Sequence, residues 1–216
     1  MPPRAVLGTG TSSGPGWYGR ALDAATSIED GGARPQGVAM PIRVDAYIAG
    51  GLASGVLARA GHLRDILEGA PSLDLERASW WALGETTGRP AGDISIPVDD
   101  LLIAAADDDP VVPVHASWHP VQLEVGPYRV DGELPTLPGY DPGRSLTRPT
   151  GEFVMLRDVR LAMLSDPGPG APIGHHALVN RYGVERVTAD LMLGFFFPGA
   201  SMDGQDAEDA ATAAPT

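Results

Sequence analysis

Residues 118–161, WHPVQLEVGPYRVDGELPTLPGYDPGRSLTRPTGEFVMLRDVRL, hold the clearest run of strand and turn signals in the chain. Apolar residues at Val121, Leu123 and Val125 alternate with polar ones, as in a strand that is buried on one face. A Gly126-Pro127 turn follows, and apolar residues resume from Tyr128. This pattern predicts a β-hairpin, around which the rest of the chain can be arranged.

A similar stretch begins at Ile42, at a constant offset of 77 residues from this hairpin. The offset places Val44 with Val121, Ile48 with Val125, Gly55 with Gly132 and Leu57 with Leu134. Each stretch is followed by a short turn or helix and then by two further strand signals. The sequence therefore predicts a mainly β protein with minor α content, made of two small antiparallel meander or barrel-like (Sm- or SH3-like) halves. An internal duplication and a single continuous barrel or sandwich both account for the pattern.

The expected domain organisation has five parts. Compositional shifts delimit a disordered N-terminal extension (1–39), a β-rich first half (40–106) and a linker that contains the DDDP run (107–113). A β-rich second half (114–200) and a disordered acidic tail (201–216) follow. Met40 directly precedes the first strand signal, so translation starting there is one hypothesis. Val184–Phe197 is expected to form one long half-buried strand, and residues 166–172 a loop.

The hairpin also resembles the first sequence motif of Sm-like small β-barrels. The residues that carry the resemblance are Val121, Leu123, Gly126, Gly132, Leu134 and Asp141. The spacing between the two glycines is one residue longer than in that family, and residues 153–164 have no counterpart of its closing Arg-Gly motif. The resemblance implies a barrel fold and ring assembly; members of that family also bind RNA, but their RNA-contacting residues cannot be carried over to this chain. The strand pattern is also similar to that of uncharacterised bacterial proteins, which implies no activity.

Composition excludes several chemistries. Cysteine and lysine are both absent, which removes thiol nucleophiles, thiolate metal sites, Schiff-base lysines and phosphate-loop lysines. The formal net charge of −13 disfavours nucleic-acid binding unless arginines gather on one face; the candidates are Arg129, Arg144, Arg148, Arg157 and Arg160. No apolar run is long enough for a membrane helix and no signal sequence is evident, so the expected location is the cytoplasm.

Histidines are the groups best suited to a metal or small-molecule site at neutral pH, and four of them fall in the second half. They are His115, His119, His175 and His176. In extended chain His115 and His119 would lie about 13 Å apart, too far to share one ion. No cofactor-binding or catalytic motif is found, and the aspartate pairs and triplets lack calcium-loop spacing.

Two aromatic clusters are the candidate partner interface. Neighbouring residues of a strand point to opposite faces, so Trp80 and Trp81 cannot both fill one core, and the same holds within Phe195, Phe196 and Phe197. Either a second layer of the fold or another polypeptide covers the remaining rings. The leading expectation is a non-enzymatic binding or assembly module that acts through protein contacts, with a partner protein or a second copy. The alternatives are a histidine-based metal or small-molecule protein and an Sm-like nucleic-acid binder.

Overall fold

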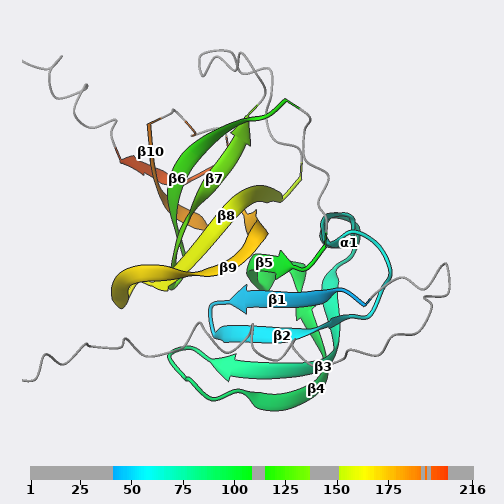
Figure 1. The fold of residues 1–216 in the computed structure, drawn as a ribbon. Coiled ribbons are helices and arrows are strands. Elements are labelled where there is room, and N and C mark those ends of the chain that lie inside the picture. Colours follow the sequence, from blue (N-terminus) through cyan, green and yellow to red (C-terminus); the bar gives the residue numbers. More distant parts are fainter. Residues whose placement is uncertain (1–40, 109–114, 137–150, 191–192, 194–195, 204–216) are drawn as a thin grey trace, which may run out of the picture.

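The computed structural model describes residues 41–108, 115–136, 151–190, 193 and 196–203, and these residues form one mainly β sheet (Figure 1). The strands lie in the order β11-β10-β6-β7-β8-β9-β5-β1-β2-β3-β4. One α-helix, α1 (Leu63–Gly69), and one 3-10 helix, η2 (Val98–Asp100), accompany them in the described residues. The strands are β1 (Arg43–Ile48), β2 (Gly51–Leu57), β3 (Ser72–Ala82), β4 (Arg89–Pro97), β5 (Leu101–Ala106), β6 (Ser117–Val125), β7 (Tyr128–Thr136), β8 (Phe153–Met163), β9 (Asp166–Asn180), β10 (Val184–Ala189) and β11 (Ser201–Asp203).

Both predicted hairpins are confirmed, because their alternation and their glycine turns are local signals. Strands β6 and β7 pair from Ser117↔Thr136 to Val125↔Tyr128 around the Gly126-Pro127 turn. Strands β1 and β2 pair around a turn at Ala49 and Gly50. Strand β4 ends at Pro97, directly before η2. Among the described residues no helix is long and apolar enough to cross a membrane.

Two element predictions are wrong. Residues 166–172 belong to strand β9 rather than to a loop, although this stretch contains three prolines. Only Ala177–Val179 of β9 pair with β5, so the proline-containing part borders β8 alone, and a proline is tolerated on such an edge. Strand β10 ends at Ala189 instead of continuing to Phe197. The chain then turns, with Phe196 N–H bonded to Leu193 O at 2.8 Å, and returns as β11, although residues 201–203 show no strand pattern.

The two halves of the sheet repeat one strand order. We use first half for residues 41–108 and second half for residues 115–203. The first half reads fifth-first-second-third-fourth strand (β5-β1-β2-β3-β4), and the second half reads the same way (β10-β6-β7-β8-β9) with β11 added at its edge. Within the described residues β4 and β11, at the two ends of the sheet, do not pair, so the sheet is not closed into a barrel.

The halves meet where β5 pairs with β9, a junction that we call the seam (Figure 1). Three residue pairs join the strands there, Ile103↔Val179, Ala104↔Leu178 and Ala105↔Ala177. The molecule has two hydrophobic clusters, and each takes side chains across the seam. Phe153, Met155 and Leu178 of the second half pack in the cluster of the first half. Tyr47, Ile103 and Ala105 of the first half pack in the cluster of the second half.

Tyr128 adds a polar contact between the halves. Its hydroxyl hydrogen lies within reach of two carbonyl oxygens at the β1–β2 turn, Ile48 O at 2.9 Å and Gly51 O at 3.1 Å. The ring is fully buried and packs edge-on against Tyr47, with 5.7 Å between ring centroids. A buried tyrosine with its hydroxyl satisfied contributes both apolar area and orientation. Tyr128 therefore fixes the turn of one half against the turn of the other.

Candidate functional site

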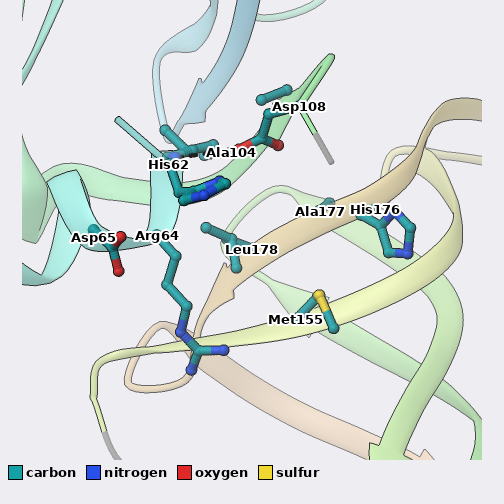
Figure 2. A pocket seen from close by; sticks show the side chains of 11 residues that line it. His62, Arg64, Asp65, Ala104, Asp108, Met155, His176, Ala177 and Leu178 are labelled. Carbon is teal, nitrogen blue, oxygen red and sulfur yellow. Dashed lines mark hydrogen bonds between the residues drawn. The ribbon is translucent and has the colours of Figure 1, made fainter. Parts of the chain in front are cut away.

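A pocket of about 90 Å³ lies at the seam, where α1, β5, β8 and β9 meet (Figure 2). Its apolar lining comes from both halves and consists of Leu63, Ala104, Ala106, Met155, Ala177 and Leu178. Each of these side chains belongs to, or packs against, one of the two hydrophobic clusters. The pocket is thus built on rigid elements, and junctions of this kind are a common place for binding sites.

A polar rim surrounds this apolar floor. His62 precedes α1, Asp108 follows β5, and His176 belongs to β9. Asp108 Oδ2 accepts the N–H of Leu63 at 3.2 Å. It thereby satisfies one of the donors that the first turn of a helix leaves unpaired, a role that the His62 side chain does not take. Asp108 therefore connects the end of β5 to the start of α1 and shapes the pocket opening.

Arg64 forms another wall of the pocket and links α1 to the second half. Its Nε donates to Glu68 Oε1 at 2.9 Å, and its Nη2 donates to Phe153 O at 3.2 Å. The second bond spans the seam, since α1 belongs to the first half and β8 to the second. Figure 2 shows the Arg64 side chain running from α1 toward β8. The guanidinium is thus held by contacts at both of its sides.

The pocket opens into a groove of about 590 Å³ along the outer part of the seam. The groove and the pocket share Ala106, Asp108 and His176. Farther along, the groove is lined by acidic, basic and apolar residues: Asp107, Asp158, Val159, Arg160, Pro172, Ile173, Gly174 and His175. It lies where β5 ends and β9 continues alone beside β8. The whole site is therefore a small apolar pocket beside a larger groove of mixed polarity.

The polar groups of the pocket are imidazole, carboxylate and guanidinium groups. None of its lining residues is a serine, threonine, tyrosine or cysteine. Among the described residues no group of three or more His, Asp or Glu side chains is placed to hold a metal ion. The polar groups that do line it are two histidines, two aspartates and one arginine. This set can donate and accept hydrogen bonds at the rim of a bound chain.

The four histidines proposed as ligands lie in different surroundings. His119 Nε2 and Thr136 Oγ1 share a hydrogen bond of 2.9 Å between β6 and β7. His175 is almost fully exposed, with Nδ1 3.8 Å from Asp158 Oδ1. Only His176 lines the seam pocket, and His115 lies in the turn before β6. The described part of the chain thus gives these four residues no common centre.

The candidate interface aromatics are divided between core and surface. Phe196 and Phe197 are buried in the second-half cluster, with 7% and 0% of their surfaces exposed, and Phe195 lies outside the described residues. Trp80 is partly buried against the first-half cluster. Trp81, on the opposite face of β3, lines a separate cleft of about 170 Å³. Trp81 is therefore the aromatic residue of this set that borders an open surface.

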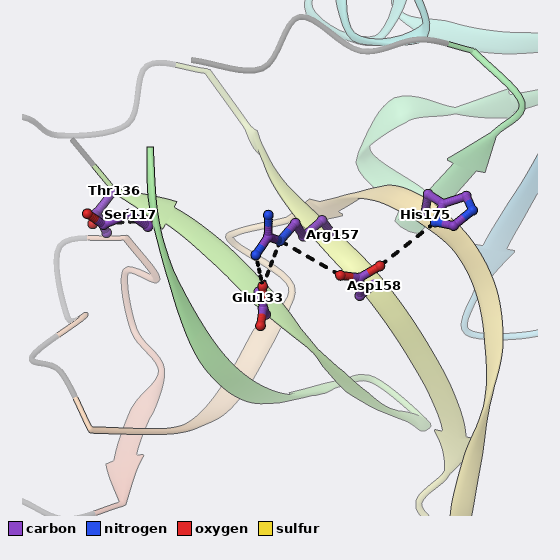
Figure 3. A network of polar contacts seen from close by, with 6 residues as sticks. All are labelled: Ser117, Glu133, Thr136, Arg157, Asp158 and His175. Carbon is purple, nitrogen blue, oxygen red and sulfur yellow. Dashed lines mark hydrogen bonds and ion pairs between the residues drawn. The ribbon is translucent and has the colours of Figure 1, made fainter. Parts of the chain in front are cut away.

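Several arginines of the second half lie beside acids, and Figure 3 shows Arg157 in contact with Glu133 and Asp158. Arg157 forms an ion pair with Glu133, and its guanidinium carbon lies 4.0 Å from the centre of the Trp118 ring. Arg129 Nε lies 3.2 Å from Asp131 Oδ2. Arg160 lines the seam groove, while Arg144 and Arg148 lie outside the described residues. The described arginines thus form no uniformly basic face of the kind that a nucleic acid requires.

Asp45 is the one carboxyl in the described residues whose surroundings disfavour its ionised form. It lies on β1, and its Oδ1 is buried without a hydrogen-bond partner among the described residues. Burial raises the pKa of Asp45 above its ordinary value, and the nearby Asp107 adds to this. The hydrogen bond from Ser54 and the charge of Arg43 oppose the rise in pKa. The ionised side chain is therefore a cost to the folded state.

Replacing Asp45 with asparagine is expected to stabilise the protein at pH 7. Because the folded-state pKa is the higher one, wild-type stability falls as the pH rises from the unfolded pKa, near 3.9, through the folded pKa. Below that window Asp45 is protonated in both states and the cost disappears. Urea unfolding at pH 7 and at pH 3.5 should show a gain at pH 7 that shrinks in acid. A variant that is less stable at pH 7, or a gain independent of pH, would contradict the expectation.

No family model, no curated protein and no solved structure matches this chain. The site therefore has to be interpreted from its own geometry. Sequence patterns gave no indication of His62, Arg64, Asp108 and Met155 as site residues. These four residues come from three segments: the start of α1, the end of β5 and β8.

Proposed function

We propose that the protein is a non-enzymatic binding module that holds a segment of a partner polypeptide at the seam. One observation carries the proposal: an apolar pocket with a polar rim, lined by no serine, threonine, tyrosine or cysteine, lies beside a larger groove. A cavity of about 90 Å³ lies between the roughly 30 Å³ occupied by one water and the roughly 150 Å³ that accommodates benzene. It therefore suits one aliphatic side chain, such as leucine, methionine or valine. The groove would take the polar residues that flank this anchor.

The scaffold of this module is proposed to be an internal duplication of a small barrel-like unit of the Sm or SH3 kind. Beyond the shared strand order, the registers of the two halves correspond. Val44 pairs with Gly55 and with Ala106 in the first half; Val121 pairs with Gly132 and with Ala189 in the second. The first strand of each half pairs with its fifth, which is how a short meander curls back on itself.

Irregularities of the two halves correspond as well. Arg77 and Asp158, each on the third strand of its half, are the two non-glycine residues with positive φ in the described chain, both at 51°. Each register shift between the second and third strands is centred on a glycine, Gly55 or Gly132. Bulges are specific devices and two unrelated meanders have no reason to share them, so they support the duplication more strongly than alternation does.

The outer edges of the sheet differ from the seam, which favours a foreign partner over a second copy. At the seam, Met155 and Leu178 are buried in the opposite half; the matching first-half residues are Asp74 and Ser95. Ser95 Oγ donates to Asp74 Oδ1 at 2.6 Å, so this edge is polar and internally bonded. At the other end of the sheet, β11 pairs with Arg186, Val187 and Thr188 of β10. These three residues occupy the positions that correspond to Ile103, Ala104 and Ala105 of β5, which pair with β9 at the seam.

Filling the pocket is expected to abolish partner binding. Ala106 is partly exposed and lines both pocket and groove, so leucine at this position occupies the space proposed for the anchor. A peptide-display selection on the full chain should enrich sequences with a single aliphatic anchor between polar residues. Ala106→Leu should weaken such a peptide by about tenfold or more, as expected for loss of a central anchor.

The chain offers a matched control for this substitution. Ala189 occupies the corresponding position of β10, paired with Val121 as Ala106 is paired with Val44. Ala189→Leu should leave peptide affinity unchanged, as measured by fluorescence anisotropy. Failure to enrich any peptide, or equal binding by the Ala106→Leu protein, would refute the proposed pocket.

A further inference from the structure

A second cleft, of about 170 Å³, lies in the first half, away from the seam. It is lined by Arg43 on β1, by Ser54, Gly55 and Val56 on β2, and by Arg77, Ser79 and Trp81 on β3. Two guanidinium groups, two hydroxyls and an indole therefore converge, with no acidic residue in the lining. In a chain of formal charge −13 this is an unusual concentration of positive charge.

The two arginines of this cleft lack the partners that other arginines have. Within the described part of the chain Arg43 and Arg77 take part in no ion pair, whereas five other arginines do: Arg59, Arg64, Arg129, Arg157 and Arg186. The nearest acidic influence is Asp45, which attracts Arg43 but is itself largely buried beneath the surface. Arg77 is held through its backbone, since its N–H donates to Asp93 Oδ1 at 3.1 Å and leaves the guanidinium exposed.

The second half provides an internal comparison for these residues. Strand registers match Arg77 with Asp158, Ser54 with Asp131 and Val56 with Glu133. The same place therefore carries three acids in the second half, and each acid there has a basic neighbour. Asp158 and Arg77 share the same backbone conformation, so the bulge occurs in both halves. It is therefore not in itself evidence of a binding site. What distinguishes the first half is a pair of cationic side chains that form no ion pair with any described residue, although Asp45 lies near Arg43.

Trp81 supplies a fixed apolar wall beside these charges. A Cβ added at Gly88 would lie 2.2 Å from Trp81 Cε2, so the loop backbone is in close contact with the edge of the indole and restrains it. Guanidinium groups bind carboxylates through paired N–H donors, and an adjacent indole covers the aliphatic part of an acidic side chain.

From these features we propose that the cleft of Arg43, Arg77 and Trp81 is an anion-binding site for a carboxylate of an acidic polypeptide segment. The cleft is separate from the seam pocket, and its occupancy does not depend on the function proposed for that pocket. A single carboxylate with a short aliphatic stem matches the two guanidinium groups and the indole. Phosphate shares the charge but lacks the stem, so it would use the arginines without using the wall.

The test is a titration of the full chain with the capped peptide acetyl-Glu-Glu-Glu-amide at low salt, followed by tryptophan fluorescence and calorimetry. Saturable binding is expected, with no binding of the glutamine analogue of the peptide. Arg43→Gln and Arg77→Gln should each weaken binding about tenfold, the effect of losing one charge-assisted hydrogen bond. Arg186→Gln, on β10 of the other half, removes the same charge and should leave the affinity unchanged.

The remaining arms separate the possible anions. Inorganic phosphate should bind more weakly than the glutamate peptide, and phosphate binding tighter than the peptide would overturn the carboxylate assignment. No saturable binding, or equal losses in Arg186→Gln and Arg77→Gln, would overturn the site itself. Near-ultraviolet circular dichroism of each variant verifies that the fold is intact, so a loss of binding reports on the cleft.

Discussion

Truncating Phe153 to alanine is expected to lower the free energy of unfolding by about 3–5 kcal/mol, as for other large aromatic residues in a core. Phe153 begins β8 in the second half, yet its fully buried ring packs in the hydrophobic cluster of the first half. Its loss leaves a cavity across the seam, which the rigid strands on both sides cannot collapse to fill. The loss should therefore destabilise both halves together.

Urea unfolding of Phe153→Ala, followed by far-ultraviolet circular dichroism and by tryptophan fluorescence, measures this effect. The two signals should shift to lower urea together, because coincident transitions indicate one cooperative unit. Leu164→Ala is the control, since Leu164 is 40% exposed and its removal should change stability by less than about 0.5 kcal/mol. A loss below about 1 kcal/mol for Phe153→Ala, or two separate transitions, would mean that the halves are not coupled through this ring.

Alanine in place of Gly55 is the second large effect, with an expected loss of about 1–3 kcal/mol from overpacking. A Cβ at this position would lie 3.0 Å from Leu75 Cβ, 3.1 Å from Glu76 O and 3.2 Å from Ala78 Cβ. Two of these neighbours are short buried groups and one is backbone, so none can move aside without disturbing the bulge between β2 and β3.

Gly69→Ala is the matched control for Gly55→Ala. Nothing lies within 4 Å of a Cβ at Gly69, the last residue of α1, and alanine there should be neutral or slightly stabilising. Chemical unfolding of the two variants and of wild type separates two effects. One is the crowding of a Cβ at Gly55 against its neighbours, and the other is the general effect of replacing glycine with alanine. A Gly55→Ala protein as stable as the Gly69→Ala protein would show that the bulge can relax.

Sequence alone was sufficient for the parts of the fold that depend on neighbouring residues. Alternating side chains and glycine turns located β1–β2 and β6–β7, and α1 follows the first hairpin, where a short turn or helix was expected. Predictions failed where the partner strand decides the outcome. The proline-rich start of β9 is a strand that borders only β8, and β10 ends at Ala189, with Leu193, Phe196 and Phe197 placed in the second-half core.

For the candidate sites too, features set by neighbouring residues were predicted and features set by strand pairing were not. Trp81 was correctly placed on the face of its strand opposite to Trp80, because that inference needs only the two-residue period. The seam pocket was not foreseen, since His62, Asp108, Met155 and His176 are separated by up to 114 residues. Asp108 in particular had the sequence appearance of a linker, and its bond to Leu63 N–H depends on where β5 ends.

The seam joins two units of one chain in the way that separate subunits usually join. Here the contact between β5 and β9 forms within a single molecule, so its strength is set by the tether between the units and not by protein concentration. A module of this design keeps its pocket assembled at any dilution. The two halves also differ in charge at a shared backbone position, since Arg77 and Asp158 have opposite charges and the same φ of 51°.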